Sequence, residues 1–268
     1  MNKLCRGWEI VRNAGITAVL MAGALSGQQP ARIPRLPDGK PNLSGIWQAM
    51  NTANWDLEEH AARPGLVLAL GAVGAEPGGP GVVDGPIPYL PAALETKKTN
   101  FAQRLTADPE IKCYLPGVPR ATYMPYPFEI LHSTKAIFFA YEYAGAVRNV
   151  FLKDPGPAPA DSWMGQSVGH WEKDTLVIDV TGLDERTWFD RAGNFHSDAL
   201  HVVERYTPMG PDVLSYEATI EDPKVFARPW KITMPLYRHV EKNARLMEFK
   251  CVEFVEDLLY GTFTKTSK

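Results

Sequence analysis

The sequence predicts a mainly β protein whose strands form an antiparallel up-and-down barrel. From residue 127 onward, apolar and polar residues alternate over short runs, which is the pattern of half-buried strands. Tight turns join the runs and no helical pattern separates them, so parallel crossovers are not expected. Closure into a barrel of about eight or nine strands removes exposed strand edges. The expected strands span residues 128–132, 136–143, 147–152, 167–172, 175–181, 199–207, 213–221, 230–237 and 245–252.

The segment before the barrel has a different pattern. Prolines at positions 30, 34, 37 and 41 favour an extended chain, and residues 65–91 are rich in Gly and Pro. Good helix formers follow a proline over residues 91–105, which predicts a helix among the one or two short helices expected. We therefore divide the chain into a signal peptide over 1–26, an extended Pro-rich N-terminal arm with its loop over 27–91, and a barrel domain with its preceding helix over 92–268.

The prediction of a signal peptide rests on the first 26 residues. Basic residues precede an apolar run over residues 14–25, and small residues follow at its end. The run is too short to cross a bilayer, which takes roughly 20 apolar residues. We therefore expect cleavage, no stable membrane insertion afterwards, and a periplasmic or secreted mature protein.

The net charge of the chain bears on its possible binding partners. Residues 1–26 carry three Lys/Arg and one Glu, so the remaining chain has a net charge of about −5, against −3 for the whole sequence. It has no basic stripe to follow a phosphate backbone, which argues against nucleic acid as a partner.

Two cysteines, Cys113 and Cys251, lie beyond the expected signal peptide. In an exported protein they most simply form one disulfide, with two buried free thiols as the alternative. The sequence does not specify an oligomeric state.

Candidate catalytic residues gather in residues 165–207, which contain three of the six histidines. On a strand that begins at residue 199, His201 and Arg205 share one face and Glu204 lies on the other. We expect His201 to face the barrel interior and to move a proton, because imidazole titrates near neutral pH. A purely structural histidine is the alternative. The candidate catalytic residues are His201, Asp190, His196, Asp179 and Arg205, with either aspartate orienting His201.

Candidate substrate-binding residues come from the same stretch and from neighbouring strands. Trp188 and Phe189 are adjacent aromatics in a long charged connection, where a solvated loop has little use for them. We expect them to cover one mouth of the barrel, either as a structural plug or as the wall of a pocket. An arginine would hold an anionic substrate group or a developing oxyanion. The substrate-binding candidates are Trp188, Arg148, Tyr143, His170 and Phe189.

A metal site has weaker support, and no cofactor is predicted. The spacing of His196, His201 and Glu204 matches neither an H-E-x-x-H helix nor a pair of histidines two apart on one strand. These three residues are the ligands to consider if a divalent metal binds. The sequence also lacks a G-x-S-x-G motif, which disfavours covalent serine catalysis.

Several longer motifs extend over most of the mature chain. They are PDGKPNLSGIW from Pro37, CxxPGxPR from Cys113, PYPFEI from Pro125, WMGxSVGxWExDTLV from Trp163, WxD from Trp188 and HSxALHVxER from His196. In these motifs the chain resembles a large family of exported soil-bacterial proteins of unknown function. The resemblance implies export and a shared fold, and it implies no particular activity.

The sequence therefore predicts an exported enzyme that carries out acid/base chemistry on a small apolar or aromatic molecule inside a β-barrel. Elimination, isomerisation or cyclisation fits better than hydrolysis, because no activated nucleophile is present. A barrel of about eight strands is just wide enough to hold one small ligand. The alternative is a non-catalytic, lipocalin-like small-molecule-binding protein. A third possibility is an interaction module whose Pro-rich arm binds a partner.

Overall fold

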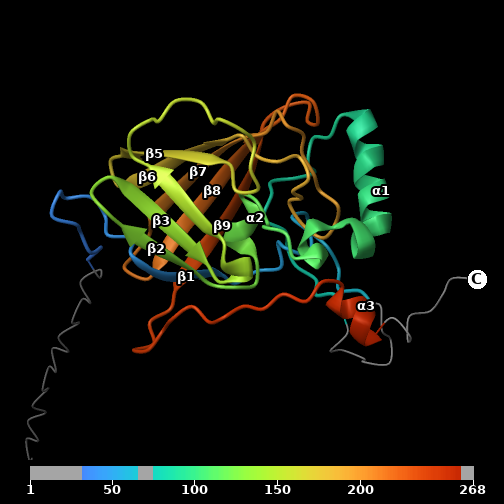
Figure 1. The fold of residues 1–268 in the computed structure, drawn as a ribbon, viewed down its shortest axis with the longest axis horizontal. Coiled ribbons are helices and arrows are strands. Elements are labelled where there is room, and N and C mark those ends of the chain that lie inside the picture. Colours follow the sequence, from blue (N-terminus) through green and yellow to red (C-terminus); the bar gives the residue numbers. More distant parts are fainter. Residues whose placement is uncertain (1–31, 66–74, 261–268) are drawn as a thin grey trace, which may run out of the picture. The chain divides into compact units, whose positions relative to one another are not determined.

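The computed structural model describes residues 32–65 and 75–260, and it confirms a mainly β fold with a closed barrel of nine strands (Figure 1). The expected signal peptide over residues 1–26 lies outside the described residues. Within the described ranges, no helix is long and apolar enough to cross a membrane. The strands are β1 (Gly45–Ala49), β2 (Phe128–His132), β3 (Ala136–Tyr141), β4 (Val147–Phe151), β5 (Gln166–Glu172), β6 (Thr175–Thr181), β7 (His201–Pro208), β8 (Val213–Glu221) and β9 (Trp230–Arg238).

The strand that closes the barrel is β1, which the sequence did not predict as a strand. It pairs antiparallel with β2 on one side and with β9 on the other. Both faces of β1 are covered, because Trp47 points into the barrel and Ile46 lies against the chain after β9. The sequence of β1 therefore lacks the alternation of apolar and polar residues by which the other strands were predicted. The expected strand over 245–252 is wrong, since these residues form no strand.

One neighbouring pair of strands is parallel. The strands β4 and β5 run in the same direction, with Val150 opposite Ser167, while the other paired strands of the barrel are antiparallel. The connection over residues 152–165 must therefore return along the barrel before β5 begins. The expectation of a purely up-and-down order is wrong at this one step, because the returning chain has no helical pattern to reveal it.

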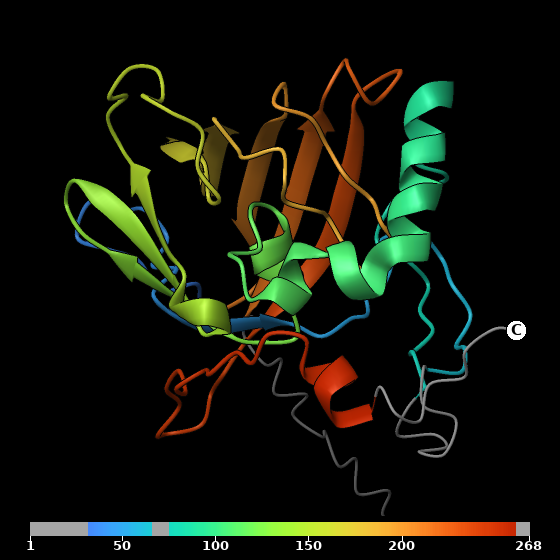
Figure 2. The same ribbon diagram turned by 45° about the vertical axis from the view of Figure 1, so that its right-hand side comes forward.

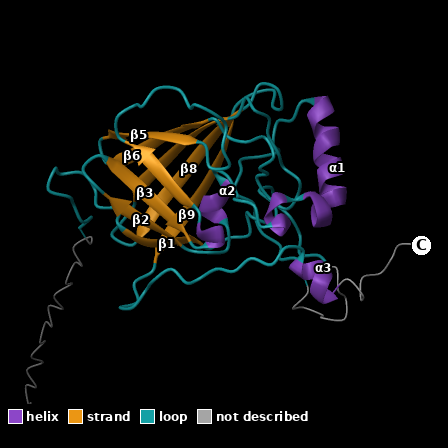
Figure 3. Cartoon of the chain, in the orientation of Figure 1, coloured by secondary structure: helices purple, strands orange, loops and turns teal. Residues whose placement is uncertain are grey.

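The helices gather at one end of the barrel, where α2 lies between the strands and α1 (Figure 2, Figure 3). The predicted helix is confirmed as α1, and a proline occupies its first turn. All four residues of α2 are buried, and the Tyr123 hydroxyl donates to the Phe189 carbonyl at 2.8 Å. The helices are α1 (Pro91–Ala107), η2 (Pro109–Lys112), α2 (Arg120–Tyr123), η3 (Tyr143–Gly145) and α3 (Val255–Tyr260).

The inside of the barrel is a packed core. Fully buried aromatic rings from four strands form a continuous row, in which each ring contacts the next. The ring centroids of Phe128 and Phe139 lie 5.9 Å apart, those of Phe139 and Tyr206 lie 5.4 Å apart, and those of Tyr206 and Tyr216 lie 5.0 Å apart. Such dense packing leaves little room for a ligand among the described interior side chains.

The described part of the N-terminal arm lies on the chain's own barrel. Arg35 forms a bidentate ion pair with Asp174 at the tip of the β5–β6 hairpin, with distances of 2.7 and 2.8 Å. The Leu43 amide donates to Nε2 of His132 at 3.2 Å. The arm therefore covers one end of the barrel, which removes the support for an arm that is free to bind a partner.

The expected disulfide between Cys113 and Cys251 is confirmed. Cys113 follows η2, and Cys251 lies in the chain that leaves β9. We call residues 239–254 the C-terminal strap. In Figure 1 it runs from the end of β9 past β1 toward α3. The disulfide joins this strap to the end of the barrel that carries the helices.

Candidate functional site

The strand β7 places Glu204 inside the barrel and His201 outside it. Glu204 is completely buried, whereas the His201 side chain is 36% exposed. Pairing with β6 and β8 fixes the direction in which Val202, Glu204 and Tyr206 point inward. The expectation that His201 and Arg205 face the interior is therefore wrong by one residue of strand phase, and every side chain of the strand changes sides with it.

Inside the barrel, Glu204 forms an ion pair with Arg148 of β4. The hydroxyls of Tyr206 and Tyr216 both donate to Oε1 of Glu204, at 3.1 and 2.8 Å. Nε of Arg148 donates to the Ser167 hydroxyl at 2.7 Å. Burial, together with the Glu204 charge, raises the pKa of both tyrosines, so they act here as neutral donors. The charge of Arg148, a substrate-binding candidate, is thus already balanced by a carboxylate.

Two buried polar atoms in this core have no hydrogen-bond partner within the described chain: Nη1 of Arg148 and the Tyr141 hydroxyl. Burial raises the pKa of Tyr141, and its contacts with Arg148 and Thr122 partly offset that rise. The two groups therefore lie close to each other inside the barrel.

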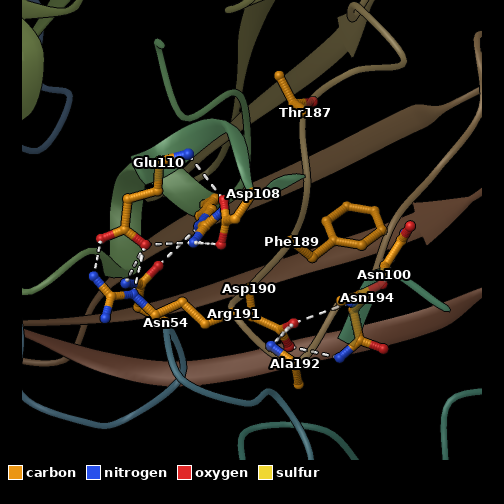
Figure 4. Close-up of polar contacts among 12 residues, drawn as sticks. Asn54, Asn100, Asp108, Glu110, Thr187, Phe189, Asp190, Arg191, Ala192 and Asn194 are labelled. Carbon is orange, nitrogen blue, oxygen red and sulfur yellow. Dashed lines mark hydrogen bonds and ion pairs between the residues drawn. The ribbon is translucent and has the colours of Figure 1, made fainter. Parts of the chain in front are cut away.

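A second buried group of polar residues lies in the connection between β6 and β7, and Asp190 is at its centre (Figure 4). Its carboxylate accepts four hydrogen bonds, from the amides of Leu57, Ala192 and Asn194 and from the Asn194 side chain, at 2.6 to 3.1 Å. Burial and the nearby Asp56 charge nevertheless raise the pKa of Asp190 to about 7. The structure shows no hydrogen bond or ion pair between Asp190 and His201, so of the two carboxylates expected to orient His201 only Asp179 lies beside it, at 3.3 Å.

Beside Asp190 lies an ionic network that the sequence analysis missed (Figure 4). Glu110 accepts bidentate hydrogen bonds from Arg191 at 2.8 and 2.9 Å. The guanidinium of Arg120 forms ion pairs with both Glu110, at 2.6 Å, and Asp108, at 2.8 Å. Burial alone would raise the pKa of Glu110, but the two arginines outweigh it and lower the pKa to about 2. Asp108, Glu110 and Arg120 lie within twelve positions of one another, but Arg191 is 81 positions from Glu110, and no local pattern connects it to them.

The remaining candidates in the β6–β7 connection have structural contacts. Nε2 of His196 lies 2.5 Å from the Thr187 hydroxyl and Nδ1 lies 2.8 Å from the Ser197 carbonyl, while burial lowers the pKa of the ring. Phe189 packs edge-on against Trp230 of β9, with ring centroids 5.7 Å apart. Trp188 is also buried, so these aromatics match the structural-plug interpretation. Tyr143 is buried as well and donates to the Glu110 carbonyl at 3.0 Å.

The other candidates lie on the outer face of the barrel. His201 sits between Asp179 at 3.3 Å and Glu221 at 3.4 Å, all three partly exposed. Arg205 pairs with Glu172 at 2.7 Å, and Glu172 also approaches His170. Pairs of this kind in contact with solvent contribute little to stability.

The alternative metal ligands do not converge. His196 is buried in the β6–β7 connection, His201 is on the outer face, and Glu204 is inside the barrel. That ligand set is therefore wrong. Among the residues that the structure describes, no group of three or more His, Cys, Asp or Glu side chains is arranged to hold a metal ion.

A concave site does exist on the outside of the barrel, between β1 and the C-terminal strap. We call it the hollow. Its volume is about 400 Å³. Ile46, Pro127 and Met247 supply apolar surface, while the polar lining includes Glu142 and Arg245. The Glu142 carboxylate accepts from the Met247 amide at 2.7 Å, which fixes the strap across this site.

On the β1 side of the hollow, His239 lies between two polar side chains. Its Nε2 lies 2.9 Å from Oε1 of Gln48, and its Nδ1 lies 3.4 Å from the Glu241 carboxylate. Arg245 has neither a hydrogen bond nor an ion pair to any of the described residues. The hollow thus combines an apolar surface with polar groups that remain available to a bound molecule. Ile46 and Pro127 belong to two of the longer motifs, but no single motif marks the hollow, because its lining comes from four stretches of the chain: 46–48, 127, 142 and 239–247.

Comparisons with protein-family models, curated proteins and solved structures each found no match.

Proposed function

We propose that this protein is an exported, non-catalytic small-molecule-binding protein whose ligand occupies the hollow between β1 and the C-terminal strap. The observation that carries the proposal is the hollow itself. Its volume of about 400 Å³ falls within the range of roughly 300–1,000 Å³ that is usual for ligand sites. Its lining also has the usual composition of an apolar surface with a few convergent polar groups.

The lining indicates the chemistry of the ligand. Ile46 and Met247 favour an apolar or aromatic body, because burying apolar area is the main source of affinity at such a surface. Two carboxylates, those of Glu142 and Glu241, face the site against the single guanidinium of Arg245. This charge balance favours a polar head that donates hydrogen bonds, such as an amine.

Acid/base catalysis inside the barrel has less support. The residues that would perform it lie in two separate places, neither of them the barrel interior. His201, Asp179 and Arg205 are on the outer face, and the β6–β7 connection holds Asp190 and His196. A general base must reach the proton that it abstracts, and the last two are buried. Binding without catalysis is therefore the better proposal.

Export is supported by the disulfide between Cys113 and Cys251. Disulfides form and persist mainly in oxidising compartments, and the N-terminal pattern of the sequence is that of a signal peptide. We therefore place the mature protein in the periplasm or outside the cell.

The ligand site is tested by titrating the protein with a set of aryl-alkylamines and recording methyl NMR spectra. We expect at least one compound to shift the Ile46 and Met247 methyl signals in a saturable manner. In a Met247→Arg variant the affinity should fall at least tenfold, because a charge of the same sign as the amine replaces apolar lining. Met209→Arg is the matched control, since Met209 is an exposed methionine in the β7–β8 turn. If no compound shifts the two methyl signals, or if both variants bind like the wild type, the hollow is not the site.

A further inference from the structure

The C-terminal strap forms most of one wall of the hollow, yet none of its side chains is buried. It supplies six of the ten lining residues, and every residue from 239 to 254 is at least partly exposed. Burial of apolar surface is what normally fixes a segment to a protein. The position of the strap therefore depends on a small number of specific attachments.

Four attachments precede the disulfide along the strap. The His239 amide donates to the Ile46 carbonyl at 2.8 Å, next to the end of β9, and Nε2 of His239 lies 2.9 Å from Oε1 of Gln48. The Met247 amide donates to Glu142 at 2.7 Å. The half-buried Phe249 ring packs on Tyr126 and Tyr143, with centroid distances of 5.0 and 4.9 Å. Only the first attachment involves backbone on both sides.

The far end of the strap is held covalently. Cys251 is bonded to Cys113, and the Phe254 amide donates to the Ile111 carbonyl at 2.9 Å. Cys113 directly follows η2, whose residue Glu110 belongs to the buried ionic network described above. The disulfide thus connects the weakly packed strap to one of the most firmly held parts of the chain.

We infer that oxidation of Cys113 and Cys251 completes the ligand site, so that the protein binds its ligand only in the disulfide-bonded form. This inference rests on the proposed function of the hollow. Formation of the bond removes two electrons and two protons from the two thiols, and an external disulfide accepts them and becomes two thiols. In the reduced protein the strap is held by four hydrogen bonds, two of them at His239 beside β9, and by one half-buried ring. Between His239 and Phe254 only the Met247 amide and the Phe249 ring then attach it, and this part of the wall of the hollow separates from the barrel.

The inference links binding to cellular location. Thiols stay reduced before export and form disulfides afterwards. A site that is completed by the disulfide is therefore absent while the chain is still in the reducing compartment, and it assembles on arrival in the oxidising one. The ligand is captured only where the mature protein is exposed to it.

The test uses the full mature chain in three forms: oxidised wild type, wild type reduced with dithiothreitol, and a Cys113→Ser/Cys251→Ser variant. Hydrogen exchange is measured at the Met247 and Phe254 amides, which are bonded across the strap. We expect exchange at least tenfold faster in the two forms without the disulfide, and unchanged exchange at the Glu204 and Tyr216 amides of the barrel. If the serine variant does not fold, the reduced wild type alone represents the form without the disulfide.

The same three forms are titrated with the arylalkylamine that shifts the Ile46 methyl signal. We expect at least a tenfold loss of affinity without the disulfide. Equal affinity in all forms, or unchanged exchange at Met247, overturns the inference and leaves the proposed function intact. Absence of binding to the oxidised wild type overturns both.

Discussion

Replacement of Arg148 by Met is expected to lower the free energy of unfolding by about 3–5 kcal/mol, because it leaves the Glu204 carboxylate buried without its cation. Both side chains are almost completely buried, and the two tyrosine hydroxyls that donate to Glu204 cannot neutralise a full charge. Urea unfolding at pH 7 measures the effect. The midpoint should fall while the slope with denaturant stays constant, as expected for a loss of stability without a change in the surface exposed.

Two variants provide the controls for Arg148→Met. Arg205→Met makes the same substitution on the outer face, where Arg205 pairs with the half-exposed Glu172, and it should cost at most about 1 kcal/mol. An Arg148→Met/Glu204→Gln double variant removes both charges and keeps an acceptor for the tyrosines, so it should regain most of the loss. If Arg205→Met costs as much as Arg148→Met, the inward face of β7 has been assigned wrongly.

Asp190 is expected to make the protein less stable as the pH rises from about 4 to about 7. Its pKa rises from 3.8 to about 7 on folding, so the folded state holds a proton that the unfolded state has lost. The stabilising contribution is fully present below the unfolded pKa and disappears as the pH passes through the folded value. A shift of about 3 pKa units corresponds to roughly 4 kcal/mol.

The measurement compares the free energy of unfolding of the wild type and an Asp190→Asn variant between pH 4 and pH 8. The amide cannot accept all four hydrogen bonds, so the variant is less stable throughout, and only the pH dependence of the difference is informative. That difference should shrink by a few kcal/mol toward pH 7. Asp161→Asn, at an exposed aspartate, should give a nearly flat difference. A difference that stays flat from pH 5 to pH 8 would show that the four hydrogen bonds keep Asp190 ionised in the folded state and would contradict the prediction.

The class of the fold and most of the strand boundaries could be predicted from the amino-acid sequence alone. The strands β2, β6 and β8 begin and end at the residues that alternation and tight turns indicate. The helix α1 begins at its initial proline, and the disulfide joins the two cysteines that lie beyond the expected signal peptide. The strands and the helix follow from patterns among neighbouring residues. The disulfide follows because only two cysteines were available to form it.

Only the tertiary structure decided which face of each strand points inward. Along β7, polar and apolar residues occur on both faces: His201, Val203 and Arg205 face outward, and Val202, Glu204 and Tyr206 face inward. Local alternation cannot choose between these faces. The choice depends on Arg148, a buried cation 56 residues away that compensates Glu204. Contacts between distant segments likewise determine that β1 closes the barrel and that the strap lines the hollow, because the energy of pairing depends on partners that no local pattern specifies.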